Sequence, residues 1–73
     1  MRLCDLGVGE TGRVLAVRQS GAMGLRLREL GLLEGTRVTC VGVSPLGTPR
    51  AYRICGAIIA LRDTDAASVE VTV

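Results

Sequence analysis

The sequence lacks the side chains on which most catalytic and stacking surfaces depend. It has no histidine, no tryptophan and no phenylalanine, and Tyr52 is its single aromatic residue. Histidine is the commonest general base and metal ligand, and serine and cysteine nucleophiles usually rely on it. Domains that bind single-stranded nucleic acid or polyproline peptides need several exposed aromatic rings. We therefore expect no catalytic residues, no enzyme, and no binder of nucleic acid or of polyproline.

Positive charge is sparse and scattered. Nine arginines and no lysine stand against seven acidic residues, which gives a net charge of +2. Domains that bind nucleic acid usually gather their basic residues on one face or in runs. The arginines of this chain are instead dispersed along it. The charge pattern therefore also argues against nucleic acid as a partner.

Long hydrophobic runs are missing too. The longest apolar run, residues 57–61, is far shorter than the roughly 20 residues that a membrane helix needs. The first seven residues are too few and too polar for a secretory signal. With 73 residues, the chain has the length of one small domain. We expect a single domain over residues 1–73 that is cytoplasmic, reduced and not inserted in a membrane.

The three cysteines do not predict a metal site. Cys4, Cys40 and Cys55 are an odd number and show none of the CxxC spacing of zinc sites. Cys40 and Cys55 lie in apolar strand contexts, where a reduced cysteine usually behaves as a small buried hydrophobe. We favour that role for both, expect Cys4 to be exposed, and leave its function open. The sequence predicts no structural metal and no cofactor, and leaves open whether a transition metal binds at the surface.

Five segments are typical of short strands. They are apolar and rich in β-branched residues, and the last can pair with the first, so the pattern predicts an all-β fold closed into a small barrel. In the last segment Val69, Val71 and Val73 should point inward. The expected strands span 13–18, 36–44, 51–54, 57–62 and 68–73. The expected core consists of Val14, Val17, Leu27, Leu30, Val38, Ile54, Ile58, Leu61, Val69 and Val71.

One helix is expected near residues 22–30. Met23, Leu27 and Leu30 recur at the spacing of a single helical face, and Gly31 follows where a left-handed cap residue belongs. Gly24 costs such a helix about 1 kcal/mol relative to alanine, so packing must hold it. A single helical turn should follow Asp63, which we take as its N-cap in preference to an acid–base role.

Three motifs carry a resemblance to a known family. They are LRELGLLEGTRV (27–38), SPLGTP (44–49) and GAIIALRDTDAASVEV (56–71). In this order and spacing they resemble the FeoA family of bacterial ferrous iron transport. Thr48 is a departure, because many members carry aspartate there, and it weakens any argument for an acid or a metal in that loop.

The resemblance implies a fold and a partner. It implies an SH3-like β-barrel of about five strands with one short inserted helix. It also implies a small accessory protein that binds and regulates the FeoB membrane transporter through the cytoplasmic GTP-binding region of FeoB. The alternative is the SH3-like regulatory module of iron- and manganese-dependent repressors, which act in transcriptional control. A FeoB-like gene beside this one would favour transport.

The segment SPLGTPR, residues 44–50, suggests where a partner binds. Pro45 and Pro49 fix two φ angles and Gly47 permits a tight turn, yet Leu46 has no evident core to fill. Two explanations stay open: Leu46 anchors a partner, or it caps an open end of the barrel.

A helical wheel adds a second set of residues to this hypothesis. It places Leu25 on the outer face of the helix beside Arg28, although a lone surface leucine usually has no role. The hypothesis of a continuous partner surface comprises Leu25, Arg28, Pro45, Leu46, Gly47, Pro49 and Arg50. A homo-oligomer is compatible with a mean hydropathy of +0.41.

Overall fold

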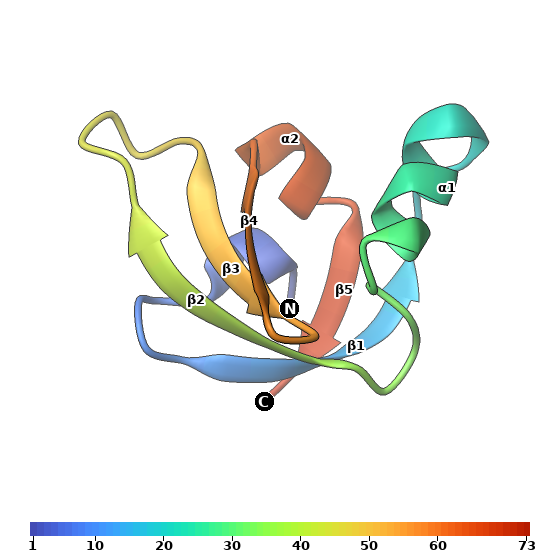
Figure 1. Cartoon of the computed structure of the whole chain (residues 1–73), viewed down its shortest axis with the longest axis horizontal. Helices are drawn as coiled ribbons and strands as arrows, with labels where there is room; N and C mark the ends of the chain where they lie inside the picture. The colour runs from blue at the N-terminus through green and yellow to red at the C-terminus, as the bar shows by residue number, and fades with distance from the viewer.

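A computed structural model describes all 73 residues as one curled antiparallel sheet with a helix at one end (Figure 1). The strands follow the order β4-β3-β2-β1-β5. Every strand overlaps a predicted one, and no end differs by more than two residues. The elements are the 3-10 helix η1 (Leu3–Asp5), β1 (Thr11–Val17), α1 (Gly21–Glu29), β2 (Arg37–Val43), β3 (Arg50–Ile54), β4 (Ala57–Leu61), α2 (Asp63–Ala66) and β5 (Val69–Thr72). None of its helices has the length and apolar character needed to cross a membrane.

The sheet curls without closing. β5 pairs with β1 as predicted, with Val14 opposite Val71 and Val17 opposite Val69. β4 and β5 are the two ends of the sheet and are not paired with each other. After β4 the chain turns into α2, which packs against η1 instead of continuing the ladder. The prediction of a closed barrel is therefore wrong, because a helical turn occupies the place where strand pairing would close it.

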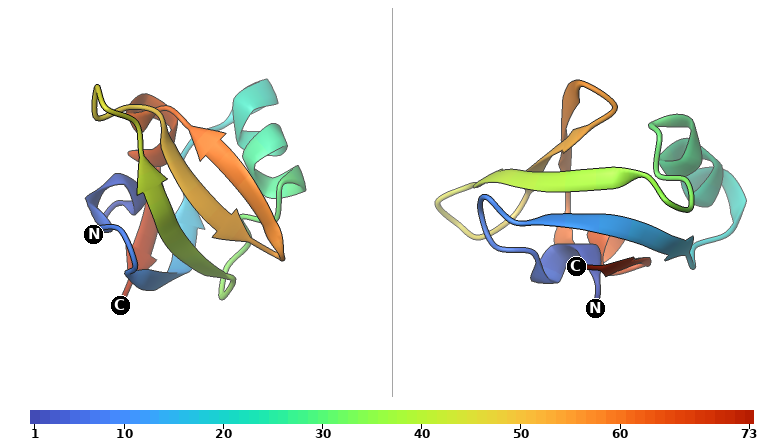
Figure 2. Two further views of the ribbon diagram at one scale, coloured as in Figure 1. Left: turned by 60° about the vertical axis from the view of Figure 1, so that its left-hand side comes forward. Right: turned by 90° about the horizontal axis from the view of Figure 1, so that it is seen from below.

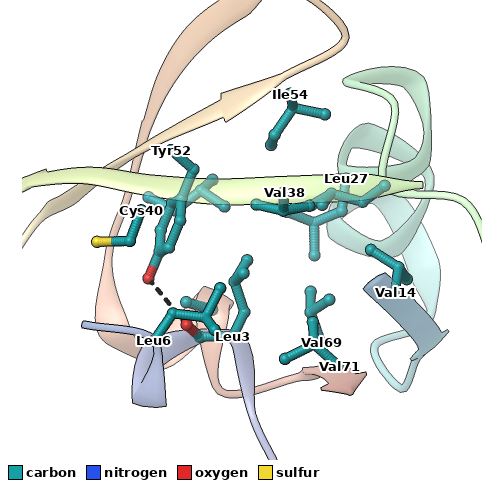
Figure 3. Close-up of a cluster of buried hydrophobic side chains, with 13 residues drawn as sticks. Leu3, Leu6, Val14, Leu27, Val38, Cys40, Tyr52, Ile54, Val69 and Val71 are labelled. Carbon is teal, nitrogen blue, oxygen red and sulfur yellow. Dashed lines mark hydrogen bonds between the residues drawn. The ribbon is translucent and has the colours of Figure 1, made fainter. Parts of the chain in front are cut away.

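The core fills the inside of the curl (Figure 3). Seven of the ten predicted core residues are buried, and Val17 and Leu30 are half-buried against the same cluster. The prediction is wrong for Ile58, which is 62% exposed. Ile58 pairs with Arg53 and shares its outward direction, since only alternate residues of a strand face the core. Val73, beyond the end of β5, is also exposed rather than inward.

The core also contains residues that the pattern did not mark. Leu3 and Leu6 enter it from η1 and its end, and Tyr52 enters it from β3. The Tyr52 hydroxyl donates to the carbonyl oxygen of Leu3 at 3.4 Å, so this polar atom is satisfied inside the cluster (Figure 3). Strand alternation cannot mark residues of a single helical turn. Leu32 and Ala66 complete the set that went unpredicted.

The cysteines divide three ways. Cys40 is buried, as expected of a small hydrophobe. The same expectation is wrong for Cys55, which is exposed in the turn between β3 and β4 at a φ of 50°. Cys4 is half-buried rather than exposed, because η1 packs against the core. The three thiols therefore occupy three different environments.

α1 begins and ends one residue before the predicted range 22–30, and it has the predicted glycine cap. Gly31 has a φ of 107°, its N–H donates to the Arg28 carbonyl, and the Leu32 N–H donates back to the Leu27 carbonyl. This pair of hydrogen bonds defines the Schellman cap. The structure also explains Gly24: a Cβ at this position would overlap the backbone carbonyl of Gln19. The glycine lets the helix approach the chain that enters it.

Candidate functional site

The loop between β2 and β3 is a tight, internally bonded turn. The Gly47 N–H donates to the Ser44 carbonyl at 2.8 Å, so Pro45 and Leu46 are the central residues of a β-turn. The Ser44 hydroxyl donates to the Thr48 carbonyl at 2.5 Å, and the Ser44 N–H donates to the Pro49 carbonyl at 3.2 Å. Gly47 has a φ of 89°, a conformation that favours glycine. The loop is therefore ordered by its own hydrogen bonds.

Leu46 stands at the tip of this turn with its side chain in solvent. It is 92% exposed, the highest value among the large hydrophobic residues of the chain. The explanation that Leu46 caps an open end of the barrel is therefore wrong. Pro45 and Pro49 are exposed beside it. The loop offers a fixed apolar tip flanked by two prolines.

The base of the loop is fastened to α2. The Asp63 backbone N–H donates to the Thr48 hydroxyl oxygen at 3.2 Å. The Asp63 carboxylate in turn accepts from the Arg50 guanidinium at 3.3 Å. Arg50 is therefore engaged at the loop base, and its side chain is only 24% exposed. A hollow of about 440 Å³ opens here, lined by Thr48, Pro49, Arg62, Asp63 and Thr64.

These contacts correct the prediction for Asp63. The N-cap of α2 is Arg62, and its side chain makes no capping hydrogen bond. Asp63 is the first helical residue, and Thr48 supplies from the loop an acceptor for its N–H, one of the backbone donors that a helix start leaves without a partner in the helix. Sequence reasoning missed this link because its partners lie 15 positions apart. No local pattern signals such a bond.

The residues predicted on α1 lie elsewhere. The loop and α1 occupy opposite ends of the long axis, as the two further views also show (Figures 1 and 2). Leu25 is 59% exposed on the helix. Arg28 donates to the Val17 carbonyl at 3.2 Å, so its guanidinium is directed to the end of β1. The structure thus brings together the five loop residues of the predicted surface and separates Leu25 and Arg28 from them.

The titratable groups form no reactive cluster. Burial raises the pKa of Tyr52 well above its usual range. Hydrogen bonds from Arg2 lower the pKa of Asp5, chiefly the bond from its backbone N–H and secondly the bond from its side chain. These two groups belong to separate structural contacts, and no group of three or more Cys, Asp or Glu residues converges as a metal site would require. The most distinct surface feature is therefore the exposed apolar tip of the β2–β3 loop at Leu46.

A curled five-stranded antiparallel sheet with a helix inserted after its first strand defines a small SH3-like domain. The model of the FeoA domain matches residues 1–73. The chain therefore belongs to the FeoA family. It is 37% identical over 71 residues to an Fe(2+) transport protein A/Fe(2+) transporter FeoB fusion protein of Porphyromonas gingivalis. That match covers 97% of this chain, which spans only 8% of the length of the fusion protein.

Solved structures agree with this assignment. The iron(II) transport protein A of Clostridium thermocellum matches with a TM-score of 0.96 at 33% identity, over 100% of this chain and 45% of that one. The zinc-complexed FeoA of Stenotrophomonas maltophilia matches with a TM-score of 0.87 at 32% identity, over 97% and 88% of the two chains. That protein is described as a prokaryotic SH3 domain protein, and the predicted SH3-like fold is confirmed.

A manganese-dependent transcriptional repressor shares the same fold, with a TM-score of 0.81 at 20% identity over 99% of this chain and 40% of that one. The structure of T. acidophilum IdeR matches with a TM-score of 0.85 at 20% identity, over 100% of this chain and 33% of that one. At this level of identity the likeness concerns the fold alone.

Proposed function

We propose that this protein is a cytoplasmic accessory component of ferrous iron uptake, which binds and regulates a FeoB-type transporter through the cytoplasmic GTP-binding region of that transporter. The observation that carries the proposal is the likeness, over 97% of this chain, to a protein in which transport protein A and FeoB are fused. Fusion holds two domains at a high effective concentration. Whether fused or separate, the domain needs a surface with which to contact FeoB.

The loop at residues 44–49 supplies such a surface. Its tip, Leu46, is apolar and exposed, while its backbone is already ordered by hydrogen bonds. Large apolar side chains that insert into a partner pocket carry much of the binding energy of small interfaces, and a pre-ordered loop loses little entropy on docking. We therefore place the principal contact at Leu46, with Pro45, Gly47 and Pro49 shaping the turn. Arg50 supports the loop from its base through Asp63.

Calorimetric titration tests this proposal directly. The purified chain is titrated into the cytoplasmic domain of the FeoB from the same organism, without nucleotide, with GDP and with a non-hydrolysable GTP analogue. We expect saturable binding in at least one nucleotide state and a changed rate of GTP hydrolysis in that complex. Absence of binding in all three states overturns the proposal. Binding with an unchanged hydrolysis rate would retain the partner and remove the regulatory role.

The second candidate is a regulatory module of the repressor type, since the chain shares its fold with a manganese-dependent transcriptional repressor. It predicts that the chain alters operator binding by a metal-dependent repressor of the same organism. A mobility-shift titration with that repressor and its operator distinguishes the two candidates. A shift that depends on this chain, together with no binding to FeoB, would select the second candidate.

A further inference from the structure

The two edge strands of the sheet differ in whether other parts of the chain cover their backbone. The β5 edge is covered by the chain start: the Val71 N–H donates to the Met1 carbonyl at 2.7 Å, and the Met1 ammonium donates to the Val71 carbonyl at 3.1 Å. The backbone of Arg2 also forms an isolated antiparallel β-bridge with Glu70. The β4 edge has no such cover, since β4 pairs with β3 alone and no other backbone group bonds to residues 57–61.

The register shows which groups the bare edge presents. Cys55 and Gly56 form a two-residue turn, with φ angles of 50° and 82°, between the paired residues Ile54 and Ala57. Hydrogen-bonded and non-bonded pairs alternate along an antiparallel ladder, and the pair beside a two-residue turn is bonded. The backbone N–H and C=O groups of Ile58 and Ala60 therefore point away from β3. They form the free edge.

The side chains of this edge carry none of the usual protection. Strands at sheet edges are commonly blunted by charges, proline or bulges. β4 reads Ala-Ile-Ile-Ala-Leu and pairs with β3 without a register shift, whereas the pairing of β1 with β5 contains one. Ile58 is exposed, as are Ala57 and Ala60, and Ile59 is half-buried. The strand is an uncharged, regular and apolar template.

We propose that the occupant of this edge is β4 of a second copy of the chain, paired antiparallel about a two-fold axis at Ile59. In this register Ile58 faces the partner's Ala60, and Ala60 faces the partner's Ile58, so a large side chain meets a small one twice. Ile58 and Ala60 are also the residues whose backbone groups point outward, so both hydrogen-bonded pairs form together. Ile59 meets its own counterpart and completes its burial.

Charge favours a second copy over an acidic peptide. The charged residues nearest the edge are Arg53, on the neighbouring strand, and Arg62, just after β4. In the proposed register Arg62 lies opposite the partner's Gly56, within an uncharged turn, so no like charges face each other. Arg62 is already paired with Asp65 at 3.4 Å. Arg53 makes no ion pair but lies on β3, one strand in from the edge, so an acidic strand would find no free cation on β4 itself.

The small size of the contact sets the strength of the dimer. Pairing of two five-residue strands buries less than the roughly 1,200 Å² of a standard stable interface. The chain should be monomeric at micromolar concentration and dimeric as it approaches millimolar concentration. The two sheets then form one continuous sheet. This inference is independent of the proposed transporter contact, because Leu46 lies in the β2–β3 loop rather than on β4.

Sedimentation equilibrium from micromolar to millimolar protein tests the dimer. The wild-type mass should rise toward twice the monomer mass. Ala60→Pro removes the outward N–H at an edge position where proline is tolerated, and Ile58→Lys places a charge in the contact. Both variants should stay monomeric at every concentration. Val8→Lys is the matched control, because Val8 has the same exposed fraction of 62% but lies in the loop before β1, and it should dimerise like wild type.

Melting curves recorded on each variant confirm that it is folded. A wild-type chain that stays monomeric at millimolar concentration overturns the proposal, as does a dimer that persists in both folded β4 variants. Amide exchange adds a further outcome. Protection of Ile58 and Ala60 on addition of the FeoB cytoplasmic domain, with no self-association, would assign the edge to the transporter instead of a second copy.

Discussion

The two ends of the long axis of the molecule are built on different principles. At the α1 end, Leu27 is fully buried, Gly24 allows a close backbone approach, and Leu32 packs beneath the helix cap. At the loop end, a hydrogen bond joins Thr48 to Asp63, Arg50 is paired with the Asp63 carboxylate, and the Leu46 side chain is exposed to solvent. One end is held by apolar packing and the other by polar contacts that leave an apolar residue outside. The loop end is therefore the one to which our proposal assigns the partner.

The largest difference between the ends should appear on truncating Leu27. Leu27→Ala deletes a fully buried side chain and should lower the free energy of unfolding by about 2–5 kcal/mol, since the core cannot refill the space. Leu25→Ala, two positions away on the exposed face, should change it by less than about 0.5 kcal/mol. Urea denaturation measures both. Equal losses would show that α1 is not held by packing.

Leu46 at the loop end should show the opposite behaviour. Leu46→Ala should weaken binding to the FeoB cytoplasmic domain by about 1–3 kcal/mol, in the range of an interface anchor. Its stability should stay within about 0.5 kcal/mol of wild type, because the side chain is exposed. Leu25→Ala serves as the control and should bind like wild type. A stable, folded Leu46→Ala that binds at full affinity would refute the loop as the contact.

The core near the loop end also contains a titratable group, and the core beneath α1 does not. Burial raises the pKa of Tyr52 above its usual value near 10, so the folded state holds this proton more tightly than the unfolded state. Stability from this source is complete below pH 10. It falls by about 1.4 kcal/mol per pH unit as the pH rises further. Tyr52→Phe should flatten the decline in denaturation curves between pH 9 and 11.5, and an equal slope in both proteins would contradict this account.

The smallest expected effect concerns the bond between the loop and α2. Thr48→Val keeps the size and β-branching but removes the hydroxyl that accepts from the Asp63 N–H. The loss should be about 0.5–2 kcal/mol, the value of a helix-capping interaction. Thr48→Asp should retain most of the stability, because a carboxylate accepts the same bond. Thermal melts of wild type and both variants rank their stabilities. A Thr48→Asp variant that is less stable than Thr48→Val would contradict the prediction.

Features fixed by near neighbours in the chain were predictable. Alternation placed Val69 and Val71 inward, and helical spacing with Gly31 located α1 and its cap. Resemblance of the motifs to a family supplied the SH3-like fold. Each of these signals acts within a few residues, where steric and hydrogen-bonding preferences decide the conformation.

Features fixed by distant contacts were not predictable. A helical wheel shows which side of α1 Leu25 occupies, but it carries no information on where the helix lies relative to the loop. The apolar run in β4 suggested burial of Ile58, which exposure at the sheet edge contradicts. Asp63 has the composition of an N-cap, and only the folded chain brings Thr48 to its N–H. In each case a tertiary contact overrode a local preference.

The ends of the described chain lie side by side, because Met1 exchanges two hydrogen bonds with Val71 (Figures 1 and 2). A linker attached at either end would leave the domain from the same place, and in these views the loop and α1 point elsewhere. A tethered copy could therefore swing about a single pivot with its Leu46 tip free. The same adjacency favours circular permutation: joining Val73 to Met1 through a short linker and opening the chain in an exposed turn should preserve the fold.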